Sequence, residues 1–153
     1  MAADGRLDIR RLGPDDLPGM RAMLDMLGVA FEEPHTFRDA PPDDAYLGRL
    51  LGRDHFVALA AFDGETAVGG LCAYVLDKFE QARAEVYIYD LAVDERYRRR
   101  GTATALIEAL KPIARASGAW AIFVQADPPD APAVALYTKL GVRADVLHFD
   151  MVL

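Results

Sequence analysis

The apolar and polar positions along the chain change their spacing several times, and each change marks a predicted element. Apolar stretches rich in β-branched and aromatic residues predict strands at residues 7–11, 55–62, 66–76, 85–93 and 120–126. Apolar residues that recur every three or four positions predict helices after Asp16, near Asp44, from Thr102 and after Asp130. At the C-terminus, alternation over residues 147–153 predicts a last, half-buried strand.

Glycine and proline mark the expected ends of these elements. Gly28, Gly52 and Gly141 are each expected to end a helix. The stretch 29–42 contains two adjacent prolines and predicts a long loop, which inside a compact domain is often functional. Pro112 lies within the helix that starts at Thr102 and is expected to bend or shorten it.

The predicted order is β, α, α, β, β, β, α, β, α, β, which indicates a mixed α/β fold. Asp63-Gly64 and the polar stretch 77–83 predict hairpin links, so the strands that they connect run antiparallel. The strand at 85–93, the following helix and the strand at 120–126 form a crossover, which predicts one parallel pair. A length of 153 residues fits a single domain over residues 1–153.

The composition restricts the class of protein. With 24 Asp and Glu against 17 Lys and Arg, the net charge of −7 argues against a nucleic acid partner and suits a cationic substrate. The single cysteine, Cys72, excludes an intrachain disulfide and a cysteine-based metal site, so we expect a buried, inert thiol and no bound metal. No apolar stretch approaches the roughly 18 residues of a membrane span. The N-terminal segment MAADGRLDIRRL also lacks the apolar region of a signal peptide, so we expect a soluble, cytoplasmic enzyme.

A basic loop is the strongest local signal. Arg96, Arg98, Arg99 and Arg100 lie within five positions, after a predicted strand and before a predicted helix. The first turn of a helix has free N–H groups and the positive end of its dipole, and Gly101 lets the backbone approach a ligand. This placement favours a phosphate site over the alternative, a solvated turn with several arginines.

The motif within this loop restricts the kind of phosphate ligand that is expected. The Gly-Lys-Ser/Thr of a Walker-type loop and a GxGxxG motif are both absent. The residues Arg98 to Ala103 form an R-x-x-G-x-A pattern, which resembles the acetyl-CoA pyrophosphate loop of the GNAT-type N-acetyltransferases. The predicted order of elements also resembles the GNAT fold over nearly the whole chain. That fold has a mostly antiparallel, twisted sheet with one central parallel βαβ pair.

Several segments resemble the gentamicin-type aminoglycoside 3-N-acetyltransferases in particular. They include YLGRLL at 46–51, FVALAAFD at 56–63, YVLDKFEQ at 74–81, YIYDLAV at 87–93, VQADPPDAPAVALYTKLG at 124–141 and HFD at 148–150. The resemblance implies acetyl transfer from acetyl-CoA to the 3-amino group of a cationic aminoglycoside antibiotic, as in drug resistance. It also implies a homodimer. No cysteine is placed for an acetyl-enzyme, so we expect direct attack in a ternary complex.

Coenzyme A would be held mainly by the basic loop and the start of the following helix. The candidates, acting largely through backbone N–H groups, are Arg98, Arg99, Arg100, Gly101, Thr102, Ala103 and Thr104. The resemblance adds main-chain groups of Leu91, Ala92 and Val93, which would pair with the pantetheine arm. One of their N–H groups would face the thioester oxygen, where negative charge develops.

Two residues are candidates for proton transfer. Asp90 is a carboxylate within an apolar strand, where burial raises the pKa and suits a general base. The alternatives for Asp90 are a structural pair with an arginine or a place at a strand end, and Glu85 is a weaker candidate. Tyr137 occupies the position where GNAT enzymes often place the tyrosine that protonates the departing thiolate. Its alternative role is a core tyrosine whose hydroxyl is bonded locally.

Acidic residues in loops would bind a polyamine sugar. The candidates are Glu32, Glu33, Asp127, Asp130, Asp145 and Asp150, each of which could instead serve only to solvate the surface. Many GNAT proteins carry asparagine where Asp130 stands, so a cofactor contact is not expected there, and Asp130 would cap the helix or meet the substrate. His148, beside Asp150, is a further candidate for a substrate or interface contact.

Three other functions are compatible with the sequence. One is the same chemistry on another amine, such as a polyamine or a protein N-terminus. Another is a non-catalytic acyl-CoA-binding module that regulates a partner. The third is a general phosphate-binding domain without acyl chemistry.

Overall fold

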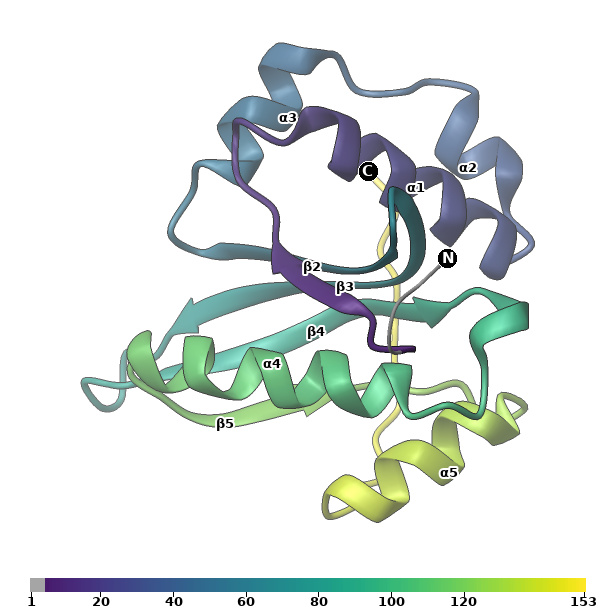
Figure 1. Ribbon diagram of the computed structural model, residues 1–153. Coiled ribbons are helices and arrows are strands. Elements are labelled where there is room, and N and C mark those ends of the chain that lie inside the picture. The colour runs from purple at the N-terminus through teal and green to yellow at the C-terminus, as the bar shows by residue number, and fades with distance from the viewer. Residues whose placement is uncertain (1–4) are drawn as a thin grey trace. The chain divides into compact units, whose positions relative to one another are not determined.

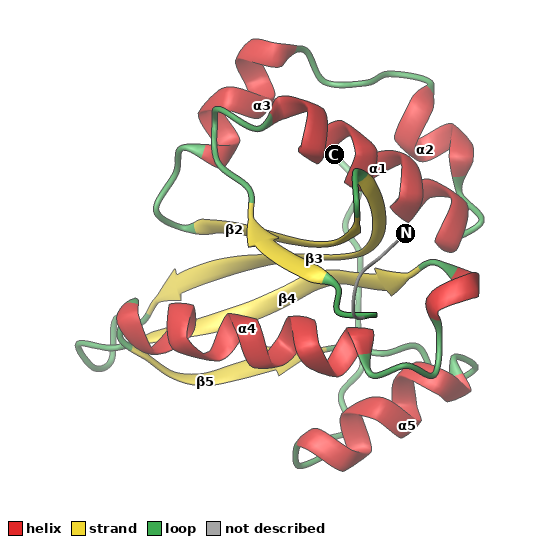
Figure 2. Ribbon diagram, viewed as in Figure 1, coloured by secondary structure: helices red, strands yellow, loops and turns green. Residues whose placement is uncertain are grey.

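The computed structural model describes residues 5–153, and its central feature is one sheet with strand order β1-β2-β3-β4-β5 (Figures 1 and 2). The strands are β1 Asp8–Arg11, β2 Phe56–Asp63, β3 Thr66–Asp77, β4 Ala84–Val93 and β5 Ala119–Val124. The helices are α1 Leu17–Ala30, α2 Pro34–Arg38, α3 Asp44–Leu51, α4 Thr102–Ala116 and α5 Ala131–Leu140, with a 3₁₀ turn η1 at Glu95–Tyr97. The described chain divides into a large unit that ends at Phe123 and a small unit, Val124–Leu153.

The predicted mixed α/β fold and strand directions are confirmed. β1 with β2, β2 with β3, and β3 with β4 each pair antiparallel. β4 and β5 form the one parallel pair, joined by the crossover helix α4. Within residues 5–153, no helix combines the length and hydrophobicity that crossing a bilayer requires.

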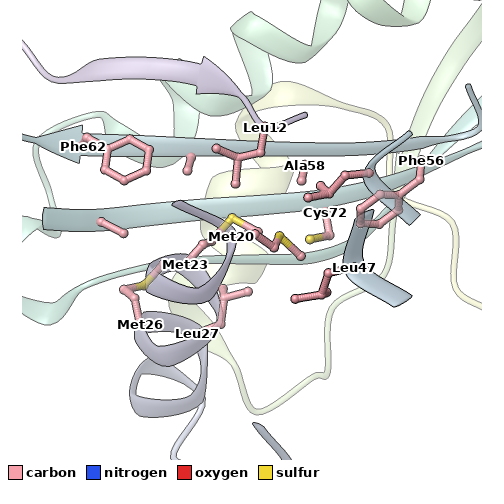
Figure 3. Packing of buried hydrophobic residues seen from close by; sticks show 13 residues of the cluster. Leu12, Met20, Met23, Met26, Leu27, Leu47, Phe56, Ala58, Phe62 and Cys72 are labelled. Carbon is pink, nitrogen blue, oxygen red and sulfur yellow. The ribbon is translucent and has the colours of Figure 1, made fainter. Parts of the chain in front are cut away.

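Alternate residues of the sheet pack against different helices. Met20, Met23 and Met26 of α1 lie against the face that carries Ala58 and Cys72 (Figure 3). The methionines are at most 8% exposed, so this stripe belongs to the core. The opposite face packs against α4, whose Leu106 and Leu110 are fully buried. The centre of the sheet is therefore covered on both faces.

Two adjacent glycines in β3 allow both helices to approach closely. A Cβ on Gly70 would lie 2.6 Å from Cγ of Met23 in α1. A Cβ on Gly69 would lie 3.0 Å from Cγ2 of Thr102 in α4. A side chain at either position would therefore force the helix away from the sheet.

β4 contains a β-bulge at Tyr89. Across the ladder Cys72 pairs with Asp90 and Ala73 pairs with Ile88, so Tyr89 has no opposite residue. Successive side chains of a strand point to opposite faces, so one extra residue moves all later side chains to the other face. Asp90 therefore shares the face of Cys72, which packs with α1, and not the face of Ile88, which lies toward α4.

Three expectations about the helices and their ends need correction. α1 continues past Gly28 to Ala30, and the predicted loop contains the short helix α2, which begins at Pro34. Proline is compatible with the first turn of a helix, because a backbone N–H at that position would have no partner within the helix. Pro112 does not shorten α4, which continues to Ala116 because Ala114 is buried beyond it.

The predicted C-terminal strand is absent from the structure. Residues 142–153 form no strand, and Leu147, Phe149 and Met151 are 75–87% exposed. A strand needs a neighbour to pair its backbone groups, and the small unit offers only α5 and the last residue of β5. Alternating apolar and polar residues are therefore not sufficient to form a strand when no partner strand is available.

Gly70→Ala tests the close packing of α1 on β3. Met23 is fully buried and has no room to move, so the added methyl group should destabilise the protein by about 1–3 kcal/mol. Gly48→Ala is the control, because a Cβ at this position in α3 meets nothing within 4 Å. Replacing glycine by alanine inside a helix should stabilise the protein by up to about 1 kcal/mol. Urea unfolding of both variants measures the difference, and equal stability would contradict the packing.

Candidate active site

The basic loop between β4 and α4 adopts an unusual backbone. Arg99 has φ of 62° and Gly101 has φ of 77°, so both lie in the left-handed region. Such a conformation is uncommon for arginine and directs backbone N–H groups toward one side, as in anion-binding nests. A Cβ on Gly101 would meet nothing within 4 Å, so the space in front of the loop is open.

The N-terminus of α4 has no side-chain cap. By contrast α1, α3 and α5 are each capped by an aspartate whose carboxylate accepts a backbone N–H: Asp16, Asp43 and Asp130. α4 starts after Gly101 with no such bond. The first N–H groups of α4 and its positive dipole end are therefore left for a ligand anion.

The arginines of the loop are exposed and carry uncompensated charge. Within residues 5–153, Arg98, Arg99 and Arg100 form no ion pair with a carboxylate. Arg96 differs, because its guanidinium pairs with Asp94 at 3.1 Å. Three free guanidinium groups therefore surround an uncapped helix end in a chain whose net charge is −7.

Tyr97 anchors the loop to the β2–β3 hairpin. Its hydroxyl donates a hydrogen bond to the carboxylate of Asp63, and this bond holds the pKa of Tyr97 above its usual range. The guanidinium of Arg100 lies 5.2 Å from the centre of the Tyr97 ring. Arg98 Nε donates to the carbonyl of Val93 at 3.3 Å, which ties the loop to the end of β4.

Thr102 fixes the start of α4 against the sheet. It is only 4% exposed, and among the described residues its Oγ1 has no hydrogen-bond partner. A buried hydroxyl without a partner is costly, so this atom suits a contact with a bound ligand. Ala103 and Thr104 follow it and are half-buried.

The last residues of β4 join the loop to the carboxylate. Leu91, Ala92 and Val93 pair with Leu71, Gly70 and Gly69 of β3, and all three are half-buried. Asp90 immediately precedes them. One strand therefore runs from the candidate base to the candidate phosphate loop.

Asp90 is half-buried and carries an unpaired carboxylate. Burial raises its pKa, and the nearby negative charge of Glu33 raises it further. Within residues 5–153 it forms neither an ion pair nor a side-chain hydrogen bond, so the alternative of a structural pair with arginine is not observed. Glu85 is less suited as a base, because its carboxylate accepts from Trp120 Nε1 at 3.1 Å and lies 3.4 Å from Lys78 Nζ.

Glu32 and Glu33 lie between α1 and α2. Both are exposed, and Glu32 has φ of 57°, in the left-handed region. Glu33 is the carboxylate whose charge acts on Asp90. The structure thus associates two of the predicted acidic residues, Glu33 and Asp90, in the large unit.

Cys72 is a poor nucleophile in this setting. Burial and the adjacent charge of Asp90 raise its pKa to about 12. At neutral pH only about one thiol in 10⁵ would be ionised, and the thiolate is the reactive form. The expectation that the thiol is buried is confirmed by its 9% exposure.

Tyr137 and four of the predicted acidic residues belong to the small unit. Asp130 caps α5 by accepting from the N–H of Ala133 at 3.2 Å, as the sequence suggested. Burial and the charge of Asp130 raise the pKa of Tyr137 to about 12. Asp127 is exposed before α5. The carboxylates of Asp145 and Asp150 are paired locally, with Arg143 at 2.7 Å and with His148 at 2.8 Å.

Sequence reasoning missed three tyrosines near Asp90. The electrostatic neighbours of Tyr74 are Cys72, Tyr46, Tyr89 and Asp90, which places these groups close together on one face. The YIYD stretch contained the signal, but regular alternation would place Tyr89 and Asp90 on opposite faces. Only the bulge brings them together. In the described part of the chain, no three His, Cys, Asp or Glu residues are grouped closely enough to bind a metal ion.

Comparison with known proteins agrees with this geometry. The Acetyltransferase (GNAT) family profile matches residues 20–142. An aminoglycoside acetyltransferase from an uncultured soil metagenomic sample is 53% identical, with a TM-score of 0.95 over 97% of this chain and 99% of that one.

A second soil metagenomic aminoglycoside acetyltransferase has been solved with two ligands. Its trehalose complex is 33% identical, and its sisomicin complex 32% identical. In both cases the TM-score is 0.90 and 98% of each chain is covered. The comparison with curated proteins finds no match. A family profile over most of the chain, together with these relatives, shows that the chain belongs to the GNAT family of acetyltransferases.

Proposed function

We propose that this protein transfers the acetyl group of acetyl-CoA to the 3-amino group of an aminoglycoside. The observation that carries the proposal is the strand β4, which places an unpaired, half-buried Asp90 shortly before an uncapped, arginine-rich helix start. The first feature suits a base for an amine, and the second suits the pyrophosphate of coenzyme A. The relatives named as aminoglycoside acetyltransferases, one of them bound to sisomicin, support the substrate class.

The loop residues would bind the phosphates of the coenzyme. Backbone N–H groups of Gly101, Thr102, Ala103 and Thr104 would donate to pyrophosphate oxygens, and Arg98, Arg99 and Arg100 would compensate the charge. Main-chain groups of Leu91, Ala92 and Val93 would pair with the pantetheine arm. An N–H of this segment would stabilise the thioester oxygen as it becomes negative.

Asp90 would accept the proton that the amine must lose. An ammonium group cannot attack a carbonyl carbon, because it has no lone pair. A raised pKa makes the carboxylate a stronger base, and the half-buried site strengthens its attraction for the cation. The acceptor would react as the neutral amine, after its ammonium proton has passed to solvent. The C–N bond forms, the C–S bond breaks, and the proton that then remains on the nitrogen passes to Asp90 directly or through one water.

Tyr137, in the small unit, would stabilise the departing sulfur. With a pKa of about 12 its hydroxyl keeps its proton at neutral pH and can donate a hydrogen bond to the thiolate. An ordinary thiol has a pKa of about 8.5, so complete transfer from this phenol is uphill. The phenol therefore stabilises the thiolate mainly by hydrogen bonding, and the thiol proton is restored from solvent.

The acidic residues would select a polycationic acceptor. Glu33, whose charge acts on Asp90, and its neighbour Glu32 belong to the large unit, and Asp127, Asp130 and Asp150 would contribute from the small unit. Another amine, such as a linear polyamine, would use the same charges. A panel of amines in one assay separates these acceptors.

Thiol release from acetyl-CoA, with gentamicin as acceptor, tests the function. We expect turnover by the native protein, and Asp90→Asn should lower kcat by roughly 10²- to 10⁴-fold because an amide cannot accept the proton. NMR of the product should show one acetamide, at the 3-amino group. A non-catalytic acyl-CoA-binding module would instead bind coenzyme A without thiol release, and the Asp90 variant would change nothing.

Glu33→Gln tests the electrostatic coupling to Asp90. Activity requires ionised Asp90, so kcat/KM should fall as the pH decreases through its pKa. Removing the Glu33 charge lowers that pKa, and the acidic limb of the profile should move to lower pH. Glu32→Gln is the matched control, since Glu32 is not among the charges acting on Asp90. An equal shift of the acidic limb in Glu33→Gln and Glu32→Gln would contradict a specific coupling between Glu33 and Asp90.

Gly101→Ala tests the phosphate loop. The left-handed backbone at φ of 77° disfavours alanine by about 1–2 kcal/mol, and the methyl group would enter the open space before the loop. We expect KM for acetyl-CoA to rise about tenfold, since roughly 1.4 kcal/mol corresponds to that factor.

Gly118→Ala provides the control at the other end of α4. Gly118 has φ of 79° and also meets nothing within 4 Å, so the backbone cost should be similar. Thermal unfolding should show comparable losses of stability, while KM for acetyl-CoA should change only in the Gly101 variant. An unchanged KM for acetyl-CoA in both variants would exclude this loop as the site that binds the phosphates of the coenzyme.

A further inference from the structure

A row of aromatic rings crosses β2, β3, β4 and β5 in the large unit. Phe56 and Tyr74 have ring centres 5.3 Å apart, and Tyr74 lies 5.8 Å from Tyr89, edge to face. Tyr89 lies 5.8 Å from Tyr87, which in turn stacks on Phe123 at 4.6 Å with ring planes 4° apart. The rings therefore form a continuous surface and are not scattered singly.

Part of this surface is exposed. α1 and α3 cover the buried end of the row at Phe56, whereas Tyr74 is 37% exposed and Tyr89 is 63% exposed. Tyr46 of α3 is 53% exposed and is an electrostatic neighbour of Tyr74. Contiguous exposed aromatic surface is uncommon on proteins and typically marks a binding site.

The exposed tyrosines adjoin the candidate base. Tyr89 is the bulged residue before Asp90, and Tyr74 is two positions from Cys72, the residue paired with Asp90. Burial, followed by the neighbouring groups Cys72, Tyr46, Tyr89 and Asp90, raises the pKa of Tyr74. The Tyr74 phenol thus remains a neutral hydroxyl group beside a carboxylate.

Sugar rings of an aminoglycoside match this combination of groups. Each ring presents an apolar face of C–H groups that can lie on an aromatic ring, and its hydroxyl and ammonium groups project from the edges. Aromatic rings also attract cations over their faces. Asp90 and Glu33 would receive ammonium groups, while the phenol hydroxyls offer hydrogen bonds to sugar oxygens. Ligand sites commonly combine such apolar surface with a few polar groups.

We propose that Tyr46, Tyr74 and Tyr89, the tyrosine platform, bind the sugar rings of the aminoglycoside and thereby orient its amino group toward Asp90. This inference rests on the proposed function. The charge complementarity between the adjacent carboxylates and a polycationic sugar favours this occupant over a second copy of the chain.

Steady-state kinetics of Tyr89 variants, with gentamicin and acetyl-CoA, test the platform. Tyr89→Leu removes the ring but keeps an apolar side chain, and Tyr89→Phe keeps the ring but removes the hydroxyl. We expect KM for gentamicin to rise about three- to tenfold in the leucine variant, the range expected for a lost aromatic contact. In Tyr89→Phe, KM for gentamicin should stay within about twofold of the native value. KM for acetyl-CoA should not change in either.

Phe79→Leu is the matched control. Phe79 is 99% exposed in the turn between β3 and β4 and lies outside the platform, so its loss should leave KM for gentamicin unchanged. Thermal unfolding verifies that all variants fold, and sedimentation at the assay concentration verifies their oligomeric state.

The outcomes separate the platform from the proposed function. Turnover by the native protein with an unchanged KM in Tyr89→Leu would overturn the platform alone. Equal rises of KM for gentamicin in Tyr89→Leu and Tyr89→Phe would assign recognition to the hydroxyl and overturn ring contact. An equal rise of this KM in the Phe79→Leu control would also overturn ring contact. A changed oligomeric state without a change in KM would identify the face as a contact between copies. No turnover of gentamicin by the native protein would overturn the proposed function and the platform with it.

Discussion

One extra residue in β4 determines where the carboxylate of this protein points. Ile88 faces α4, and in a regular strand Asp90 would face the same way, toward the apolar side chains of Leu106 and Leu110. The bulge at Tyr89 moves it to the opposite face, beside Cys72 and within the field of Glu33. A lone ionised carboxylate under α4 would be costly, whereas the observed position is partly open to water and substrate. The proposed role of Asp90 therefore depends on a local change of strand register.

The same strand separates two opposite electrostatic environments. At Asp90 the field is negative and suits an ammonium group. A few residues later, the uncapped start of α4 and three unpaired arginines create a positive field that suits phosphate. Aspartates cap α1, α3 and α5, whereas α4 and the short helix α2 have no side-chain cap. A cationic acceptor and an anionic donor can thus be held next to each other without competing for one site.

Sequence patterns anticipated the features that depend on local chemistry. The basic motif before Thr102 predicted the helix start, and an acidic residue within an apolar strand singled out Asp90. The apolar pattern alone could not locate the bulge at Tyr89, because an inserted residue leaves no mark on the apolar stretch around it. Its consequence, the neighbouring tyrosines 46, 74 and 89, was missed for the same reason. The influence of Glu33 arises from the turn between α1 and α2, and that turn depends on tertiary packing.

The ends of elements were less predictable because packing overrides local preference. Gly28 would end an isolated helix, yet α1 continues to Ala30 while Met26 and Leu27 remain buried. Residues 147–153 have the alternation of a strand but no strand partner in the small unit. In both cases the deciding factor is a neighbour distant in sequence, which no local pattern encodes.

An NMR titration of the Asp90 side-chain carboxyl carbon tests the central claim most directly, when it is compared with the pH profile of kcat/KM for the native protein. The account predicts that Asp90 titrates above the usual range of aspartate and that the acidic limb of the profile coincides with this titration. An Asp90 that titrates in the ordinary range, or a profile whose acidic limb lies elsewhere, would contradict its role as the base.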